Sequence, residues 1–415
     1  MAFFFTELDD RIRPKGSRDP LGLEHVWSLV GRRLIGNLTT VTNNLDNFIL
    51  AILGFELSSD AEGKPQWEIF EKYEQIIART RYLMPGEYAK GILGSRKISS
   101  TQNFDPIPLG SKKDASILSY AQQSGLWGIY ASALAATGLS KSDRVLTDEG
   151  RQFAKEFLET LPKSSLRWLK EVLEKSSVSR KELNTFAAAL KQTLYSTLPR
   201  LKLKKVLLNG SLEMRPQNIQ EELHKQAIEY QKQHNTDNLF TFFDYVVHNS
   251  QELGGFSQKV MKLEAVLIIA RRVFDYLLGR HGATREELAV ELKSLDNWPK
   301  RSELEIPDFM EISNAAWKKR VSGLKAFVEP VRQGDWLAAA DNLIAHHAAV
   351  MKTRSGPSWV FFDNNAIKVI FRGQETELPT QQQMVTEVSE YWDNSYFVDS
   401  FLAVLRQTST GRAEI

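Results

Sequence analysis

The chain has 415 residues, of which 42% are hydrophobic, and this is enough for two or three domains that each bury a core. Its 53 Lys and Arg residues nearly balance 51 Asp and Glu residues, so net charge alone attracts neither nucleic acid nor an anionic membrane. The sequence contains no cysteine, which excludes disulfides, thiolate metal sites, iron–sulfur clusters and a cysteine nucleophile.

The first residues do not resemble a targeting signal. Residues 2–5 form a short apolar run that acidic residues soon follow, which is far shorter than the apolar part of a signal peptide. No stretch approaches the roughly 20 apolar residues that a membrane span needs. We therefore expect a cytoplasmic protein without membrane contact.

The segment GRRLIGNLTTVTNNL, residues 31–45, could form either a phosphate-binding loop or the polar start of a buried helix. Gly31 and Gly36 have the spacing of a P-loop, but Asn37 and Leu38 stand where that loop needs Lys and Ser or Thr. The sequence therefore favours the second interpretation.

An apolar stripe follows directly and predicts a core helix. Asn43 or Asn44 is a suitable cap for this helix. The stripe consists of Leu45, Phe48, Ile49, Ile52 and Leu53.

Between about residues 84 and 114 the periodicity lapses into a segment rich in glycine, proline and basic residues. We place a boundary here and predict an N-terminal helical region over residues 1–110 that ends in a basic loop.

Residues 111–210 could contain a winged-helix-like region. Residues 116–136 would supply its helical pair and Val145–Thr147 its wing strand. Thr147 or Asp148 would cap the next helix, which extends through Phe157. Since winged helices often serve protein contacts, this prediction leaves DNA binding open.

Residues 211–415 are predicted to form a helical domain with one β-hairpin. The hairpin is expected near residues 358–372, where two β-rich runs flank Asp363-Asn364-Asn365, residues that tolerate positive φ. The predicted fold class is therefore mainly α and multi-helical, with a winged-helix-like segment and one C-terminal β-hairpin.

No complete catalytic or metal-binding motif is found. His346 and His347 are adjacent, so on a helix they diverge by about 100° and cannot easily bind one ion together. Asp363 and Lys368 resemble part of a nuclease site, but Ala366 occupies the position where that class has a further acid. We expect no catalytic residues, no metal and no cofactor.

Basic clusters are the remaining candidate sites. If they converge in space they could bind phosphates, and if they do not they merely solvate the surface of a neutral protein. The candidates for nucleic-acid binding are Arg32, Arg33, Arg96, Lys97, Lys112, Lys113, Lys202, Lys204 and Lys205.

The N-terminal half resembles a loosely defined group of uncharacterised helical bacterial proteins encoded beside helicases and nucleases in antiviral defence clusters. The resemblance departs at residues 43–48, where the group often has an aromatic-rich Arg-Tyr run, and it covers about a third of the chain. The resemblance implies a role in phage defence but gives no mechanism. It also suggests Thr39 and Thr40 as partner-binding residues. The similar segments are residues 19–23, 34–42, 94–96, 116–130 and 146–150.

The leading hypothesis is a non-enzymatic subunit of a bacterial antiviral defence complex, which binds a partner protein and has double-stranded DNA as a second candidate partner. One alternative is a metal-dependent nuclease with a dispersed acidic site. The other is a purely structural adaptor that makes no nucleic-acid contact.

Overall fold

The computed structural model describes residues 19–59, 65–86, 90–210, 219–234, 236, 238–293, 301–371 and 392–407. These residues are mostly helical, as predicted, and they include two short antiparallel strand pairs. None of the described helices combines the length and the apolar character that crossing a membrane requires.

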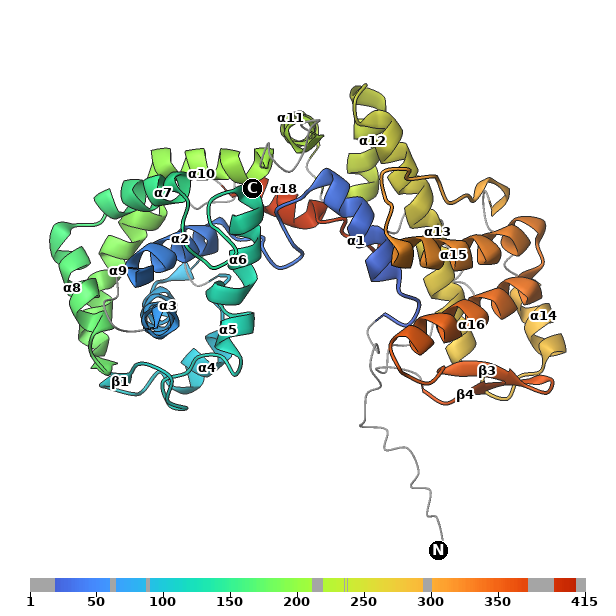
Figure 1. Ribbon diagram of the computed structural model, residues 1–415, viewed down its shortest axis with the longest axis horizontal. Helices are drawn as coiled ribbons and strands as arrows, with labels where there is room; N and C mark the ends of the chain where they lie inside the picture. The colour runs from blue at the N-terminus through green and yellow to red at the C-terminus, as the bar shows by residue number, and fades with distance from the viewer. Residues whose placement is uncertain are drawn as a thin grey trace, which may run out of the picture. The chain divides into compact units, whose positions relative to one another are not determined.

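Contacts divide the chain into two units (Figure 1). Unit 1 comprises residues 1–33 and 236–396, and unit 2 comprises residues 34–235 and 397–415. This division differs from the three consecutive regions that the sequence predicted. Local periodicity cannot show that segments far apart in the chain share one core.

Unit 2 is built around α2 (Leu45–Ser59), which is mostly apolar and is buried on almost all sides. A helix of this kind is stable only when neighbours cover it all round. The remaining elements of unit 2 are α3 (Gln66–Tyr82), α4 (Ser95–Ser100), β1 (Ile107–Pro108), α5 (Ala121–Ser124), α6 (Leu126–Thr137), α7 (Asp148–Glu159), α8 (Lys163–Leu173), β2 (Ser177–Val178), α9 (Arg180–Leu194), α10 (Thr197–Asn209), α11 (Ile219–Gln233) and α18 (Val398–Arg406).

Side-chain caps begin several helices of unit 2 where the sequence predicted them. The Asn44 side chain accepts a hydrogen bond from the Asn47 backbone at 3.1 Å, at the start of α2. Thr147 caps α7 through the Gly150 backbone amide at 3.2 Å. The expected wing strand consists of a single antiparallel bridge between Ser140 and Leu146, and the winged-helix arrangement stays a prediction.

Unit 1 contains most of α1 (Leu23–Leu34) together with elements from the second half of the chain. These are α12 (Leu239–Asn249), α13 (Gly254–Leu278), α14 (Arg285–Lys293), the 3-10 turn η4 (Arg301–Glu303), α15 (Ala315–Gln333), α16 (Trp336–Thr353), β3 (Val360–Asp363) and β4 (Ala366–Val369). The predicted C-terminal hairpin is confirmed, with Val360 opposite Val369 and Asn364 at a φ of 54° in the turn.

The two adjacent histidines of α16 connect three segments of unit 1. His346 Nε2 lies 2.9 Å from the Leu21 carbonyl oxygen, and His347 Nδ1 lies 2.9 Å from the Pro20 carbonyl oxygen. The Trp359 backbone amide donates to His347 Nε2 at 2.9 Å. Burial lowers the pKa of His347 to about 4, so at neutral pH this imidazole is uncharged and can accept that bond.

Candidate functional site

Two of the predicted basic pairs lie in neighbouring segments of unit 2. Gly94 packs so closely against Ile117 that a Cβ on this glycine would lie 2.5 Å from the Ile117 carbonyl oxygen. Ile98 and Ile117 also share a small hydrophobic cluster with Ala78 of α3. These contacts bring α4, with Arg96 and Lys97, next to the segment that follows Lys112 and Lys113. We call these four residues the basic loop surface.

The side chains of the basic loop surface face solvent. Arg96, Lys97, Lys112 and Lys113 are all exposed. Within the described part of the chain, none of them forms an ion pair. Two acids lie in the same segment: Asp114 is exposed, whereas Asp105 accepts a hydrogen bond from the Arg180 backbone amide at 3.2 Å. Positive charge therefore predominates.

Backbone contacts hold the loop that carries Lys112 and Lys113. The Gln75 side chain of α3 donates to the Gly110 carbonyl at 2.9 Å and accepts from the Gly110 amide at 2.8 Å. Gly110 has a φ of +104°, a conformation that favours glycine. One step earlier, the Leu109 amide donates to the Ser176 carbonyl at 2.9 Å beside the β1–β2 pair. These hydrogen bonds hold the loop backbone in one conformation.

A buried arginine lies beside α4, which carries Arg96 and Lys97. Arg79 of α3 is only 3% exposed, and its Nη1 donates to Thr101 Oγ1 at 3.1 Å, immediately after α4. Its Nε and Nη2 atoms have no hydrogen-bond partner within the described residues. Burial lowers the pKa of Arg79, but an arginine remains charged at neutral pH. This cation adds to the positive potential of the basic loop surface.

The other predicted basic residues do not join this surface. Lys202, Lys204 and Lys205 lie on α10, which Figure 1 shows on the side of unit 2 away from α4 and β1. Lys202 is paired with Glu156 at 3.0 Å, and Lys204 donates to the Gln407 carbonyl at 2.9 Å. Burial lowers the pKa of Lys204 to about 8.

Arg32 and Arg33 form the last basic turn of α1 and belong to unit 1. Arg33 is exposed, whereas Arg32 is half-buried, and this burial lowers its pKa. Four of the nine predicted residues are therefore brought together on the basic loop surface.

The Gly36–Thr42 segment forms an ordered turn. The Thr39 amide donates to Thr42 Oγ1 at 2.6 Å, and the Thr42 amide donates to the Thr39 carbonyl at 3.1 Å. Asn37 anchors the turn through its side-chain amide, which donates to the Leu207 carbonyl at 2.8 Å. Thr39 thus shapes the turn, and Thr40 is exposed.

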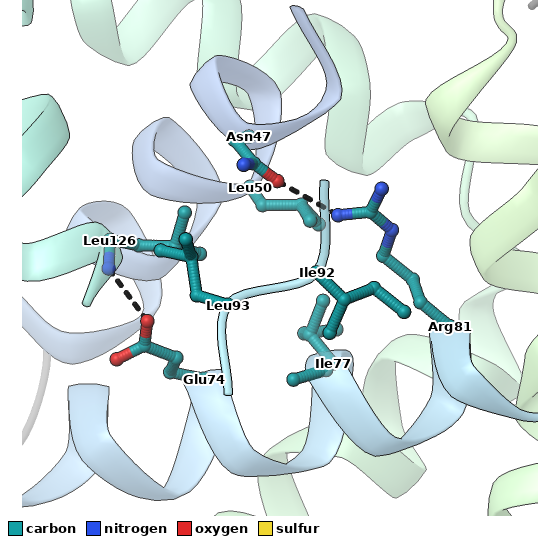
Figure 2. A pocket seen from close by; sticks show the side chains of 9 residues that line it. Asn47, Leu50, Glu74, Ile77, Arg81, Ile92, Leu93 and Leu126 are labelled. Atoms are coloured by element: carbon teal, nitrogen blue, oxygen red, sulfur yellow. Dashed lines mark hydrogen bonds between the residues drawn. The ribbon is translucent and has the colours of Figure 1, made fainter. Parts of the chain in front are cut away.

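Unit 2 also contains a buried polar cluster that the sequence did not predict. Asp46 pairs with Arg200 at 2.6 Å and with Arg81 at 3.7 Å, and Arg81 Nη1 donates to Asn47 Oδ1 at 2.8 Å (Figure 2). The sequence contains one sign of this cluster. Glu74 and Arg81 fall on the same helical period of α3 as Phe70 and Ile77, so two charged residues interrupt an apolar stripe.

A small pocket lies beside this cluster and is lined by Asn47, Glu74 and Arg81 among others (Figure 2). Its volume of about 10 Å³ holds one water molecule at most, so it cannot be a substrate site. Glu74 accepts a hydrogen bond from the Leu126 amide at 2.6 Å, and burial raises the pKa of this carboxyl to about 7. Glu74 therefore holds the beginning of α6 in place.

The acid and lysine of the hairpin form an ion pair with each other, because Lys368 Nζ contacts Asp363 Oδ2. Both side chains are substantially exposed. Among the residues that the structure describes, no group of three or more His, Asp or Glu side chains is placed to hold a metal ion.

The fold and the site together define a mainly α-helical protein of two units, one of which carries an ordered basic surface. Comparison with protein-family models, with curated proteins and with solved structures gives no match.

Proposed function

We propose that the chain is a non-enzymatic binding subunit of a bacterial antiviral defence complex, and that unit 2 contacts DNA phosphates through the basic loop surface. The convergence of Arg96-Lys97 with Lys112-Lys113 supports the DNA contact. The defence setting rests on the sequence resemblance alone.

Contacts of this kind recognise the charge of the phosphates and do not depend on the base sequence. Each phosphate that a Lys or Arg neutralises releases counterions, so four contacts imply a slope of roughly −3.5 in log affinity against log salt. We therefore expect moderate affinity at low ionic strength and little preference among duplex sequences.

The test measures duplex DNA binding across a salt series. Changing Lys112 and Lys113 to alanine should lower the affinity by about tenfold or more at low salt and reduce the slope by about two, since two phosphate contacts are lost. Lys202→Ala with Lys205→Ala is the matched control, because these lysines lie on α10 away from the surface. Absence of wild-type binding at low salt would overturn the DNA contact and favour the structural adaptor. Cleavage of the same duplex after adding Mg²⁺ would favour the nuclease.

The contact with a partner protein is best placed on the outer face of α10. Leu198 is 63% exposed and Leu201 is 45% exposed, with Lys202 and Lys205 on the same helical face. Such a face fits an acidic partner surface that carries apolar anchors. Leu198→Ser with Leu201→Ser should abolish co-purification of the partner from the native host, and Thr39→Ala with Thr40→Ala should weaken it if the turn takes part.

A further inference from the structure

A pocket of about 300 Å³ lies between α8 and α9 in unit 2. Its lining includes the aromatic pair Trp168 and Phe186, the polar residue Ser165, and the charged residues Lys181 and Glu182. Phe186 is buried at 3% exposure, Trp168 is partly exposed, and Lys181 at the rim is exposed. The pocket thus combines an aromatic wall with a few polar groups.

The aromatic wall is held in place from within unit 2. The rings of Trp168 and Phe186 lie 4.8 Å apart at an interplanar angle of 37°. Trp168 Nε1 donates to Glu182 Oε1 at 3.4 Å, and Glu182 itself is fixed by the capping box that begins α9, where it accepts from the Ser179 amide at 2.9 Å. The indole therefore needs little reorganisation to accept a flat ligand.

The pocket is connected to the segment between the two basic pairs through β2 and the start of α9. β2 pairs with β1, with Val178 opposite Ile107, and α9 starts directly after β2. The first residue of α9, Arg180, donates its amide to Asp105 of the segment between the two basic pairs. Lys181 at the pocket rim is the next residue along α9. A polyanion bound to the basic loop surface would thus pass close to the pocket.

We propose that this pocket receives one unpaired nucleobase, stacked on Trp168, while the flanking phosphates lie on Lys181 and the basic loop surface. The proposal rests on the proposed function and assigns single-stranded nucleic acid, or a single-stranded end of a duplex, as the preferred ligand. A base offers an aromatic face for Trp168 and N–H donors on its edge. The Glu182 carboxylate, which accepts from Ser179 and Trp168 and pairs with Lys175 at 3.8 Å, orients the indole that the base stacks on.

Two oligonucleotides of equal length separate base binding from phosphate binding in the full-length protein. One is an oligodeoxycytidylate, and the other has the same backbone with abasic sites. Stacking on an aromatic side chain contributes about 1–3 kcal/mol per base, so Trp168→Ala should weaken binding of the first about tenfold. Binding of the abasic oligonucleotide should not change. Trp168→Phe should keep most of the affinity, because it retains an aromatic face.

A second variant protects the test from a general folding defect. Thr185→Trp adds a ring at an exposed position that lines the pocket, so it should block base-dependent binding and leave Trp168 in place. If neither Trp168→Ala nor Thr185→Trp alters the preference for the base-containing oligonucleotide, the pocket proposal is wrong. The same holds if Trp168→Ala weakens both oligonucleotides equally and Thr185→Trp weakens neither.

A further variant distinguishes failure of the proposed function from failure of the pocket proposal. Lys112→Ala with Lys113→Ala should weaken both oligonucleotides to the same extent. If it does so while the Trp168 variants have no effect, the basic loop surface stands without the pocket. Binding of neither oligonucleotide by the wild-type protein would overturn both, and binding of an aromatic partner peptide in competition would assign the pocket to a protein ligand instead.

Discussion

Asp46 is the residue that neutralises two buried arginines of unit 2. Its carboxylate lies 2.6 Å from Arg200 and 3.7 Å from Arg81, and both arginine side chains are about 2% exposed. Tyr195 also donates to this carboxylate at 3.4 Å. Neither guanidinium can lose its proton near neutral pH, so removing the Asp46 charge leaves both buried cations less compensated.

Asp46→Asn should therefore destabilise the protein strongly. Removing one partner of a buried ion pair leaves an uncompensated charge and costs about 3–5 kcal/mol. Urea unfolding followed by tryptophan fluorescence measures the change. The control is Glu156→Gln, which removes the more exposed pair with Lys202 and should cost less than about 1 kcal/mol. Equal effects of the two substitutions would contradict a special role for Asp46.

Glu74 should make the stability of unit 2 depend on pH. Burial raises the pKa of this carboxyl from 4.5 to about 7, so the folded protein holds its proton more tightly than the unfolded chain does. Stability from this residue is therefore greatest below pH 4.5, decreases as the pH rises to about 7, and then stays constant. The decrease is roughly 3–4 kcal/mol, at 1.4 kcal/mol for each of about 2.5 pKa units.

Glu74→Gln tests this pH dependence. The glutamine carbonyl can still accept from the Leu126 amide, but it does not ionise. We expect the variant to be more stable than the wild type at pH 8 and equally stable at pH 4.5, as measured by urea unfolding at both pH values. If the stability of the wild type falls no more than that of the variant between pH 4.5 and pH 8, the raised pKa of Glu74 is refuted.

At the scale of elements, the packing of α2 against α3 depends on a glycine. A Cβ on Gly54 would lie 2.6 Å from the Phe70 ring and 2.8 Å from the Tyr73 ring. Both rings belong to α3 and are buried, so neither can move aside without disturbing the core.

Gly54→Ala should destabilise the protein by about 1–3 kcal/mol, which is typical of overpacking. Gly255 in α13 is the matched control, because an added Cβ there meets no atom within 4 Å. Gly255→Ala should be neutral or stabilise by up to about 1 kcal/mol, since alanine reduces the entropy of the unfolded chain. Thermal unfolding of both variants measures the difference, and a neutral Gly54→Ala would show that α2 and α3 can separate freely.

At the scale of the whole molecule, unit 1 joins the start of the chain to a segment that begins about 200 residues later. Trp27 of α1 packs edge-on against Tyr396 at 6.0 Å, and a Cβ on Gly31 would lie 2.8 Å from the Tyr396 carbonyl oxygen. Tyr396 in turn donates to the buried Glu264 of α13 at 2.9 Å. The N-terminal helix is thus part of the core of unit 1.

Deleting residues 1–33 should destabilise unit 1 selectively, although most of unit 1 lies far downstream in sequence. Hydrogen exchange with mass spectrometry should show lost protection in α13 and α16, whereas α2 and α3 of unit 2 keep theirs. Trp27→Ala should change the same helices to a smaller extent. Loss of protection confined to unit 2 would contradict this grouping of the chain.

The sequence alone established the helical class, the C-terminal hairpin and some helix beginnings, because these features depend on neighbouring residues. The caps at Asn44 and Thr147 and the positive φ at Asn364 show this directly. Each involves side chains and backbone groups within a few residues of one another, and such interactions leave local patterns.

Only the tertiary structure decided which distant residues meet. It joined Arg96-Lys97 to Lys112-Lys113 through the contact of Gly94 with Ile117, and it placed the α10 lysines elsewhere. It also paired Asp46 with Arg200, 154 positions away in the chain. Burial and charge pairing depend on the packing of whole helices, and no local period in the sequence reveals that packing.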